Sequence, residues 1–313
     1  MPDEQHKHKH HHKKKKRWWK WVLIALGLFL LVDAVIVGKL YFDAKKAVDV
    51  TYKAVKHDDK RTGSVNLDNG QPFSVLLLGS DTGEYGRTEQ GRSDTIMVAA
   101  VTPKKTELLS IPRDTLVTIA GHPGNNKINA AYSYDGVSGA LNTLQSYLDI
   151  PIDHYIEINM KGLEQLSEAI GPVKVDNDLE FTNLDVHFPK GEVTINADNI
   201  LAYTRMRYED PRGDYGRQLR QRQVLTALVE KAASIDSLAK YHSILNAISA
   251  NMKTDLTFDD IKDIVTNYGG AKNIDQIQLK GNGQMIDGVS YEVVPKENLD
   301  EVRSQLKQTL KLK

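Results

Sequence analysis

From residue 73 onward, short apolar runs alternate with stretches of helical periodicity, and this alternation restricts the fold more than any other feature of the sequence. The segments predicted as the first three strands are Phe73–Leu78, Thr95–Val101 and Thr106–Ile111. Val137–Leu148 then repeats leucine on one face of a helix. Strands that alternate with helices pack as layers, with helices on both faces of a sheet. We therefore expect an α/β fold, an α/β/α sandwich with a central mixed sheet, in residues 73–313.

Later segments determine how the site is built and how the sheet is completed. The pattern predicts a loop and turn at Leu184–Glu192 and an extended segment at Thr204–Tyr208. It predicts a helix at Gln218–Ser234, a strand at Val289–Val294 and a closing helix at Glu297–Leu310. Whether the last of these segments only complete the sheet or add a separate function is left open.

The N-terminal part of the chain has the features of a membrane anchor. Residues 21–38, WVLIALGLFLLVDAVIVG, hold one charge, Asp33, and are long enough for one transmembrane helix that precedes the folded domain. Lysines and an arginine in residues 1–20 come before it, which places this His/Lys-rich tail in the cytoplasm. A cleaved signal peptide is the alternative, but no small-residue cleavage site follows the apolar run. Residues 39–72 are expected to form a stalk and linker to an extracytoplasmic domain.

Charge and cysteine content exclude several classes of function. The first 38 residues carry 8 Lys/Arg and 3 Asp/Glu, which leaves 33 basic and 38 acidic residues in the body of the chain. An acidic body argues against nucleic acid as a partner, because non-specific binding needs clustered basic charge. The chain has no cysteine, which excludes thiolate zinc sites and cysteine nucleophiles and agrees with a protein on the outer surface of a Gram-positive type bacterium.

Two carboxylates mark the turn between the first two predicted strands. Asp81 follows the strand that ends at Leu78, and Asp94 directly precedes the next strand. Carboxylates fixed beside rigid strands suit a hard cation such as Mg²⁺, with Mn²⁺ as the alternative. Both residues are also common turn formers, so this pair alone does not separate a metal site from an ordinary turn.

Arginines gather at predicted strand ends and at one helix start. In the expected extended segment, Arg205 and Arg207 would point to the same side. On the following helix, Arg217, Arg220 and Gln221 would share a face near the N-terminus, where an anion is favoured. Each arginine taken singly is more often a solvated or ion-paired surface residue. The complete set that we consider together is Arg92, Arg113, Arg205, Arg207, Arg217, Arg220 and Gln221.

Guanidinium groups bind phosphate oxygens through paired hydrogen bonds, so this set together with the two carboxylates predicts a pyrophosphate ligand. Phosphoryl transfer depends mainly on positioning and on neutralising charge, which such residues supply. The sequence has no GxxxxGK[ST] motif, so a P-loop enzyme is excluded.

The motifs resemble those of the LytR-CpsA-Psr family, in family order and spacing. The similar segments are LLLGSDTG, GRSDT, LSIPRDT, KINAAYSYDG, YTRMRYED and DYGRQLRQRQV, which together span about residues 73–232. The resemblance implies a Mg²⁺-dependent phosphotransferase on the outer face of the membrane. Such an enzyme moves a glycopolymer, for example teichoic acid or capsule, from an undecaprenyl-pyrophosphate carrier to a peptidoglycan sugar through a phosphodiester.

The resemblance also implies roles for individual residues. Asp81 and Asp94 match the metal carboxylates, and Arg113, Asp94, Arg205 and Arg207 match the catalytic set. The pyrophosphate-binding residues would be Arg92, Arg113, Arg205, Arg207, Arg217, Gln221 and, by the same pattern, Arg220. The family's fold would hold the polyprenyl chain in an apolar tunnel. The leucines of Val137–Leu148, together with Leu163, Leu166 and Ile170, could line it if they are not ordinary core.

Two other functions remain open at this point. A pyrophosphatase would act on the same lipid with water in place of the sugar hydroxyl. A transcriptional attenuator or regulator of cell-wall genes is the second, since the family has also been described in that role. Topology and anionic lipid already explain the basic residues of the tail, which weakens the case for DNA contact.

Overall fold

The computed structural model describes residues 37–58, 60–61, 63–81, 91–232 and 241–312. The chain divides into two compact units, Met1–Lys45 and Lys46–Lys313, and everything that follows concerns the second. The tail expected at residues 1–20, and the anchor expected at residues 21–38 except for its last two positions, lie outside the described residues. In the part of the chain that is described, we find no helix with the length and apolar character needed to cross a membrane.

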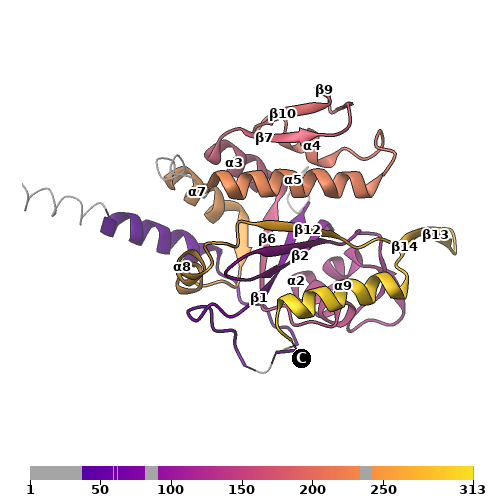
Figure 1. The fold of residues 1–313 in the computed structure, drawn as a ribbon, viewed down its shortest axis with the longest axis horizontal. Helices are drawn as coiled ribbons and strands as arrows, with labels where there is room; N and C mark the ends of the chain where they lie inside the picture. The colour runs from indigo at the N-terminus through magenta and orange to yellow at the C-terminus, as the bar shows by residue number, and fades with distance from the viewer. Residues whose placement is uncertain (1–36, 59, 62, 82–90, 233–240, 313) are drawn as a thin grey trace, which may run out of the picture. The chain divides into compact units, whose positions relative to one another are not determined.

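A six-stranded mixed sheet forms the centre of the domain (Figure 1). The two inner strands β1 and β2 are antiparallel, whereas β1 runs parallel to β6 and β3 runs parallel to β12. This arrangement confirms the expected α/β fold with a central mixed sheet. In spatial order the strands are β11 (Met252–Thr254), β6 (His154–Asn159), β1 (Phe73–Ser80), β2 (Ser93–Val101), β3 (Thr106–Ser110) and β12 (Ile274–Gln278).

Helices cover both faces of this sheet, as Figure 1 shows. On one face lie α2 (Asn129–Leu148) and α9 (Lys296–Thr309), and on the other lies α5 (Asp214–Ala232). Neighbouring residues of β1 enter different cores because side chains alternate along a strand. Leu76 packs in the α2–α9 core, whereas Val75 packs with Tyr268 on the opposite face.

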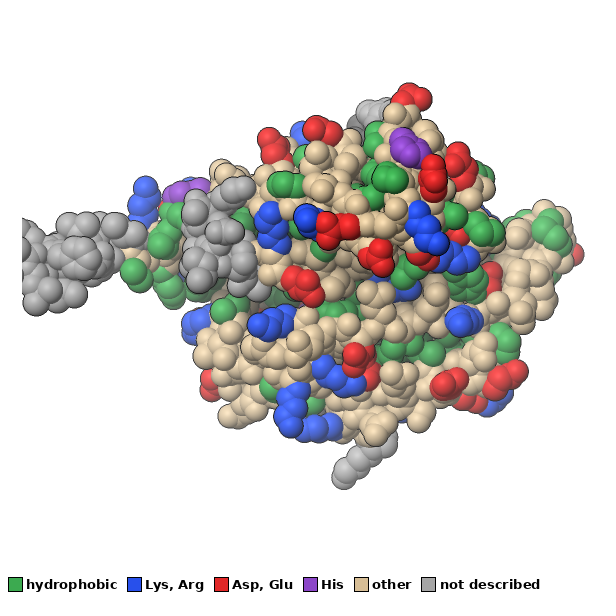
Figure 2. All heavy atoms as spheres, turned by 45° about the horizontal axis from the view of Figure 1, so that its top comes forward, with side chains coloured by type: hydrophobic (Ala, Val, Ile, Leu, Met, Phe, Trp, Pro, Cys, Tyr) green, Lys and Arg blue, Asp and Glu red, His purple; other side chains and the backbone are tan. Residues whose placement is uncertain are grey.

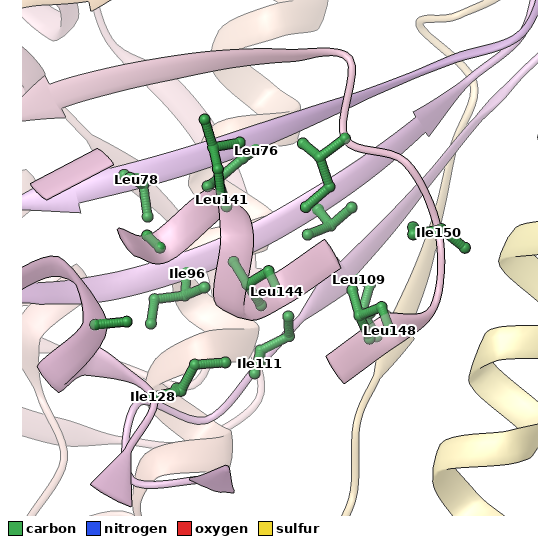
Figure 3. Packing of buried hydrophobic residues seen from close by; sticks show 14 of the residues in the cluster. Leu76, Leu78, Ile96, Leu109, Ile111, Ile128, Leu141, Leu144, Leu148 and Ile150 are labelled. Atoms are coloured by element: carbon green, nitrogen blue, oxygen red, sulfur yellow. The ribbon is translucent and has the colours of Figure 1, made fainter. Parts of the chain in front are cut away.

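The leucines of α2 are part of the ordinary core. Leu141, Leu144 and Leu148 are each 0% exposed and pack against Leu76 and other strand residues (Figure 3). Full burial of one such side chain contributes roughly 1.5–3 kcal/mol to stability. Of the two roles that the sequence allowed for these leucines, the structure supports the core.

A second group of elements lies beyond α5, around α3 (Met160–Ile170) and α4 (Ile200–Arg205). The loop predicted at Leu184–Glu192 is wrong, because strands occupy much of it. Leu184 and Asp185 form the tight turn of a hairpin with positive φ angles of 48° and 61°. Two-residue hairpin turns require such angles, and without glycine the sequence gives no clear signal for one. The strands are β7 (Val173–Asn177), β8 (Phe181–Asn183), β9 (Val186–Phe188) and β10 (Gly191–Ile195).

The segment expected as a linker lies along the domain. The backbone amide of Asp58 donates to Asn142 Oδ1 at 2.8 Å, and Lys60 Nζ donates to the Gln145 carbonyl at 2.9 Å. Arg61 binds the Asp153 carboxylate through two nitrogens, at 2.5 and 2.9 Å. Residues 46–72 therefore belong to the same compact unit as the sheet.

The C-terminal segment completes the sheet and also reaches the site. β11 and β12 form its two edges, and α9 buries Leu299 and Leu306 in the main core. The strand predicted at Val289–Val294 exists as β14 (Val289–Val293), but it pairs with β13 (Asn282–Ile286) in a separate hairpin. The remaining elements are β4 (Leu116–Thr118), β5 (Asn125–Lys127), α7 (Tyr241–Asn251) and α8 (Phe258–Asn267).

Candidate functional site

The two predicted metal carboxylates lie at the adjacent ends of β1 and β2. Gly79 pairs with Thr95 while Ser80 pairs with Ser93, so Asp94 is the extra residue of a β-bulge. A bulge redirects the side chain it carries and is frequent beside active sites. The backbone amide of Arg92 donates to Asp81 Oδ1 at 2.8 Å, which ties this end of the two strands together.

Arg113 connects the next strand to this carboxylate pair. It follows β3 and Pro112, and its Nη1 lies 2.7 Å from Asp94 Oδ1. Burial, the largest influence, lowers the pKa of Arg113, but Asp94, Asp114 and Asp214 together raise it above its ordinary value. The guanidinium is therefore fixed as a cation in a partly buried position.

Arg217 extends the cationic surface from the start of α5. Its Nη2 lies 2.5 Å from Asp214 Oδ1 and donates to the Asp94 carbonyl at 3.4 Å. Burial lowers the pKa of Arg217; the attraction of Asp214 opposes this, and the neighbouring cations Arg113 and Arg207 lower it further. The Nε groups of Arg113 and Arg217 are buried with no hydrogen-bond acceptor in the described chain. Such donors cost about 1–3 kcal/mol each, which an incoming anion would relieve.

The pair Arg205 and Arg207 does not lie on an extended segment, so that prediction is wrong. Arg205 is the last residue of α4, and the chain leaves the helix at Met206 with φ −60° and ψ 131°. The helix continues this far because Ile200, Tyr203 and Met206 are buried in the core beneath it. Arg207 Nη2 lies 4.0 Å from Asp114 Oδ2, and Lys127 Nζ binds the other oxygen of that carboxylate at 2.8 Å.

Arg220 does not lie on the same surface as Arg217. Its guanidinium is 1% exposed, lies 2.7 Å from the Asp210 carboxylate and donates to the Met206 carbonyl. Arg212, whose own side chain is 37% exposed, binds the same carboxylate. Although burial, the largest influence, raises the pKa of Asp210, its bonds to Arg212 and Arg220 lower it to about 2. Arg220 thus joins the start of α5 to the segment after α4.

Gln221, the remaining member of the set, reaches back toward the end of α4. Its Nε2 donates to the Thr204 carbonyl at 3.4 Å, and its Oε1 is buried with no partner among the described residues. The structure therefore brings Asp81, Arg92, Asp94, Arg113, Arg207 and Arg217 to one end of the sheet. Gln221 follows Arg217 along α5, Arg205 ends α4 two residues before Arg207, and Arg220 lies apart. Their binding and catalytic roles stay predictions.

A cavity of about 160 Å³ opens beside Arg207 and includes residues that the sequence did not indicate. Tyr215 lines it, and its hydroxyl donates to Glu292 Oε1 at 2.6 Å and accepts from the Gly281 amide at 2.7 Å. Glu292 comes from β14, far along the chain, so no local pattern could place it here. The other lining residues are Pro112, Asp114, Arg212, Asp214, Ser290 and Tyr291.

The donor set at the strand ends fits a hard cation. Asp94 and Asp81 supply carboxylate oxygens, and Mg²⁺ commonly takes one or two carboxylates plus substrate phosphates and water. The described residues contain no group of three or more His, Cys, Asp or Glu placed to hold a metal. A cation at this end of the sheet would therefore depend on phosphate oxygens for part of its shell.

Comparison with known proteins places the fold and the motifs in one family. The family model described as LytR_cpsA_psr matches residues 38–308. A relative from Enterococcus faecalis, named polyisoprenyl-teichoic acid–peptidoglycan teichoic acid transferase TagU, is 48% identical over 93% of this chain and 97% of its own.

Two solved structures agree with this placement. One, from Enterococcus faecalis and described as a transcriptional regulator, is 42% identical with a TM-score of 0.72 and covers 80% of this chain and 92% of its own. Another, TagT bound to LI-WTA, is 28% identical with a TM-score of 0.68 and covers 82% of this chain and 98% of its own.

Proposed function

The chain belongs to the LytR-CpsA-Psr family, and on that premise we propose that it transfers a teichoic-acid-type glycopolymer from a polyprenyl-pyrophosphate carrier to peptidoglycan. The observation that carries the proposal is the ion-paired group Asp94, Arg113 and Arg217, which presents buried guanidinium donors at the sheet end. Planar guanidinium groups suit the oxygens of a pyrophosphate better than those of a neutral ligand.

In this proposal, three arginines bind the donor and stabilise the negative charge that develops on it. Arg113 and Arg217 bind the pyrophosphate through the donors that lack an acceptor, and Arg207 approaches from the end of α4. The three cations stabilise the negative charge on the departing polyprenyl phosphate while an acceptor hydroxyl attacks the sugar-linked phosphorus. Buried charges of this kind interact more strongly with the phosphate charge than exposed ones do, because water does not screen them.

Asp81 and Asp94 would hold Mg²⁺, or Mn²⁺ in its place. A bound cation supplies further neutralisation of phosphate charge and helps to align the reacting groups. The carboxylates of this chain orient that cation and Arg113 at once, because Asp94 contacts Arg113 through one oxygen. We also propose that residues 21–38 anchor the chain, with the domain on the outer face of a Gram-positive type membrane.

The pyrophosphatase and the regulator are the competing functions. A pyrophosphatase would use the same arginines with water as the attacking group, so only its product separates it from the transferase. Figure 2 shows acidic and basic side chains interspersed on the face in view, which does not resemble the clustered basic surface that DNA binding needs. The name of the relative that is 48% identical to this chain, a teichoic acid transferase, supports the transferase over both alternatives.

The proposal is tested with the full-length chain in lipid nanodiscs. An undecaprenyl-pyrophosphate-linked glycan serves as donor and peptidoglycan oligosaccharide as acceptor, with and without Mg²⁺. The expected result is glycan joined covalently to the acceptor, with polyprenyl phosphate released in equal amount. Glycan phosphate not joined to the acceptor, as the sole glycan product, would identify a pyrophosphatase. No turnover with no bound lipid would contradict both enzyme assignments.

A further inference from the structure

We propose that the cavity beside Arg207 binds the acceptor sugar, and that Glu292 receives the proton of its attacking hydroxyl. This inference rests on the proposed transferase function and names the second substrate's site. Its walls come from the turn after β3, the start of α5 and strand β14. The cavity thus lies next to the arginines assigned to the donor, where an acceptor has to enter.

Glu292 is held rigidly by both its backbone and its side chain. Its backbone amide donates to the Asp114 carbonyl at 2.9 Å, and a parallel bridge joins it to Thr115. The Tyr215 hydroxyl donates to its Oε1 at 2.6 Å. A carboxylate that must accept a proton in a transition state benefits from such fixed geometry.

Charge distinguishes Glu292 from the other carboxylates of the cavity. Asp114 is paired with Lys127, and Asp214 is paired with Arg217. Across the part of the chain that the structure describes, the Glu292 carboxylate accepts from a neutral hydroxyl and forms no ion pair, although Arg207 and Arg212 line the same cavity. A nearby cation stabilises the charged form of a carboxylate and weakens it as a base. Of the three, Glu292 is therefore best suited to general-base work.

The lining of the cavity suits two kinds of group. Arg207 suits a phosphate, whereas Glu292 suits a hydroxyl group. Tyr291 adds an aromatic ring, over which Lys127 Nζ lies at 5.8 Å. At about 160 Å³ the cavity is smaller than the roughly 300–1,000 Å³ of typical ligand pockets, so it fits a single sugar residue and not a polymer chain.

In the proposed step, the oxygen of the acceptor hydroxyl forms a bond to the sugar-linked phosphorus of the donor. The bond from that phosphorus to the oxygen of polyprenyl phosphate breaks, and the electron pair leaves with polyprenyl phosphate. The hydroxyl proton passes to Glu292, which later returns it to solvent. Tyr215 is a positioning residue, since its hydroxyl donates to the carboxylate that takes the proton.

Variants of the full-length chain in nanodiscs test the assignment. Glu292→Gln keeps an acceptor for the Tyr215 hydroxyl but cannot take a proton. We expect transfer kcat to fall at least about 100-fold, in the range of lost general-base catalysis. Affinity for the undecaprenyl-pyrophosphate glycan, measured separately by calorimetry, should change less than about twofold. Glu301→Gln, on the exposed side of α9, is the matched control and should transfer normally.

A second variant separates a catalytic from a structural role. Glu292→Ala opens space in the cavity, and added formate should raise its transfer rate at least about tenfold, because a small carboxylate replaces the lost base. Formate should leave Glu292→Gln unchanged. Tyr215→Phe should lower kcat less than Glu292→Gln does.

Four results would overturn the inference. An unchanged kcat in Glu292→Gln would show that Glu292 is not the base. If donor affinity fell together with kcat, the cavity would be assigned to the donor's sugar instead. A rate for Glu292→Ala that does not respond to formate, with thermal unfolding as in the wild type, would also count against it. Glycan phosphate not joined to the acceptor, as the only wild-type product, would overturn the proposed function itself, which the first three outcomes leave intact.

Discussion

Asp94 and Arg113 form an ion pair of 2.7 Å between residues that come from different strand ends. The bulge at the start of β2 gives Asp94 its direction, and Pro112 precedes the turn that carries Arg113. Through its main-chain carbonyl, Asp94 also contacts Arg217. One residue thus links three separate segments of the chain at the proposed pyrophosphate site.

Replacing Arg113 tests the charge at that site. Arg113→Ala should lower transfer about 100- to 1,000-fold, the loss seen when one donor to a transition-state charge is removed. The pair is partly exposed, with 23% and 31% of the two side chains accessible, so unfolding free energy should change by no more than about 1 kcal/mol. Transfer rates and urea unfolding measure the two effects. A variant that transfers at the wild-type rate would contradict the role of Arg113.

The buried pair of Asp210 and Arg220 should be worth more to stability than to binding. Asp210→Asn leaves the Arg220 charge without its carboxylate in a site that is 1% exposed, and should destabilise the fold by about 3–5 kcal/mol. Asp178→Asn breaks only the half-exposed contact to Arg212 and is the control, with a loss of about 1 kcal/mol or less. Denaturant unfolding of both variants checks the difference. Equal losses of unfolding free energy in the two variants would mean that burial does not determine how much the Asp210–Arg220 pair stabilises the fold.

Acid should destabilise the fold through the same carboxylate. The pKa of Asp210 is about 2 in the folded chain and 3.8 as its ordinary value, so its ionised form contributes stability that is present above about pH 4. That contribution falls as the pH drops from about 4 toward 2. Thermal unfolding across this range should show a smaller slope in Asp210→Asn than in the wild type. The same slope in both proteins would assign the acid sensitivity to other groups.

Substitution of Leu144 tests whether the leucine face of α2 is ordinary core or lines a tunnel for the polyprenyl chain. Leu144→Ala should cost about 2–5 kcal/mol of unfolding free energy, because the residue is 0% exposed and leaves a cavity. Leu184→Ala, at a side chain that is 63% exposed, should cost far less. Binding of the polyprenyl donor should be the same in Leu144→Ala as in the wild type. A selective loss of donor binding without destabilisation would place the lipid against α2.

The sequence predicted the parts of the fold that depend on local pattern. The strands beginning at Phe73 and Thr95 and the leucine face of α2 follow directly from hydrophobic periodicity. A turn was expected within Leu184–Glu192, but the strands β9 and β10 in this range were missed, since the turn at Leu184 and Asp185 carries no glycine that would mark a hairpin. Val289–Val293 was found as a strand, but its partner could not be, because pairing depends on distant residues.

The sequence predicted most of the residues that gather at the site, but not the partner that each of them binds. The motifs named the residues that gather at the sheet end, yet helical spacing placed Arg220 beside Arg217. That spacing ignores Asp210, whose buried carboxylate binds Arg220 elsewhere. Glu292 was missed altogether, because it reaches Tyr215 across 77 positions of sequence.

The central claim is that the carboxylates and arginines at the sheet end carry out glycan transfer. The most direct measurement is formation of the acceptor-linked glycan by the full-length chain, compared between wild type and Asp94→Asn over a Mg²⁺ titration. We predict Mg²⁺-dependent transfer by the wild type and a loss of transfer in Asp94→Asn, with thermal unfolding nearly unchanged. Equal transfer by both proteins, with or without Mg²⁺, would contradict the account.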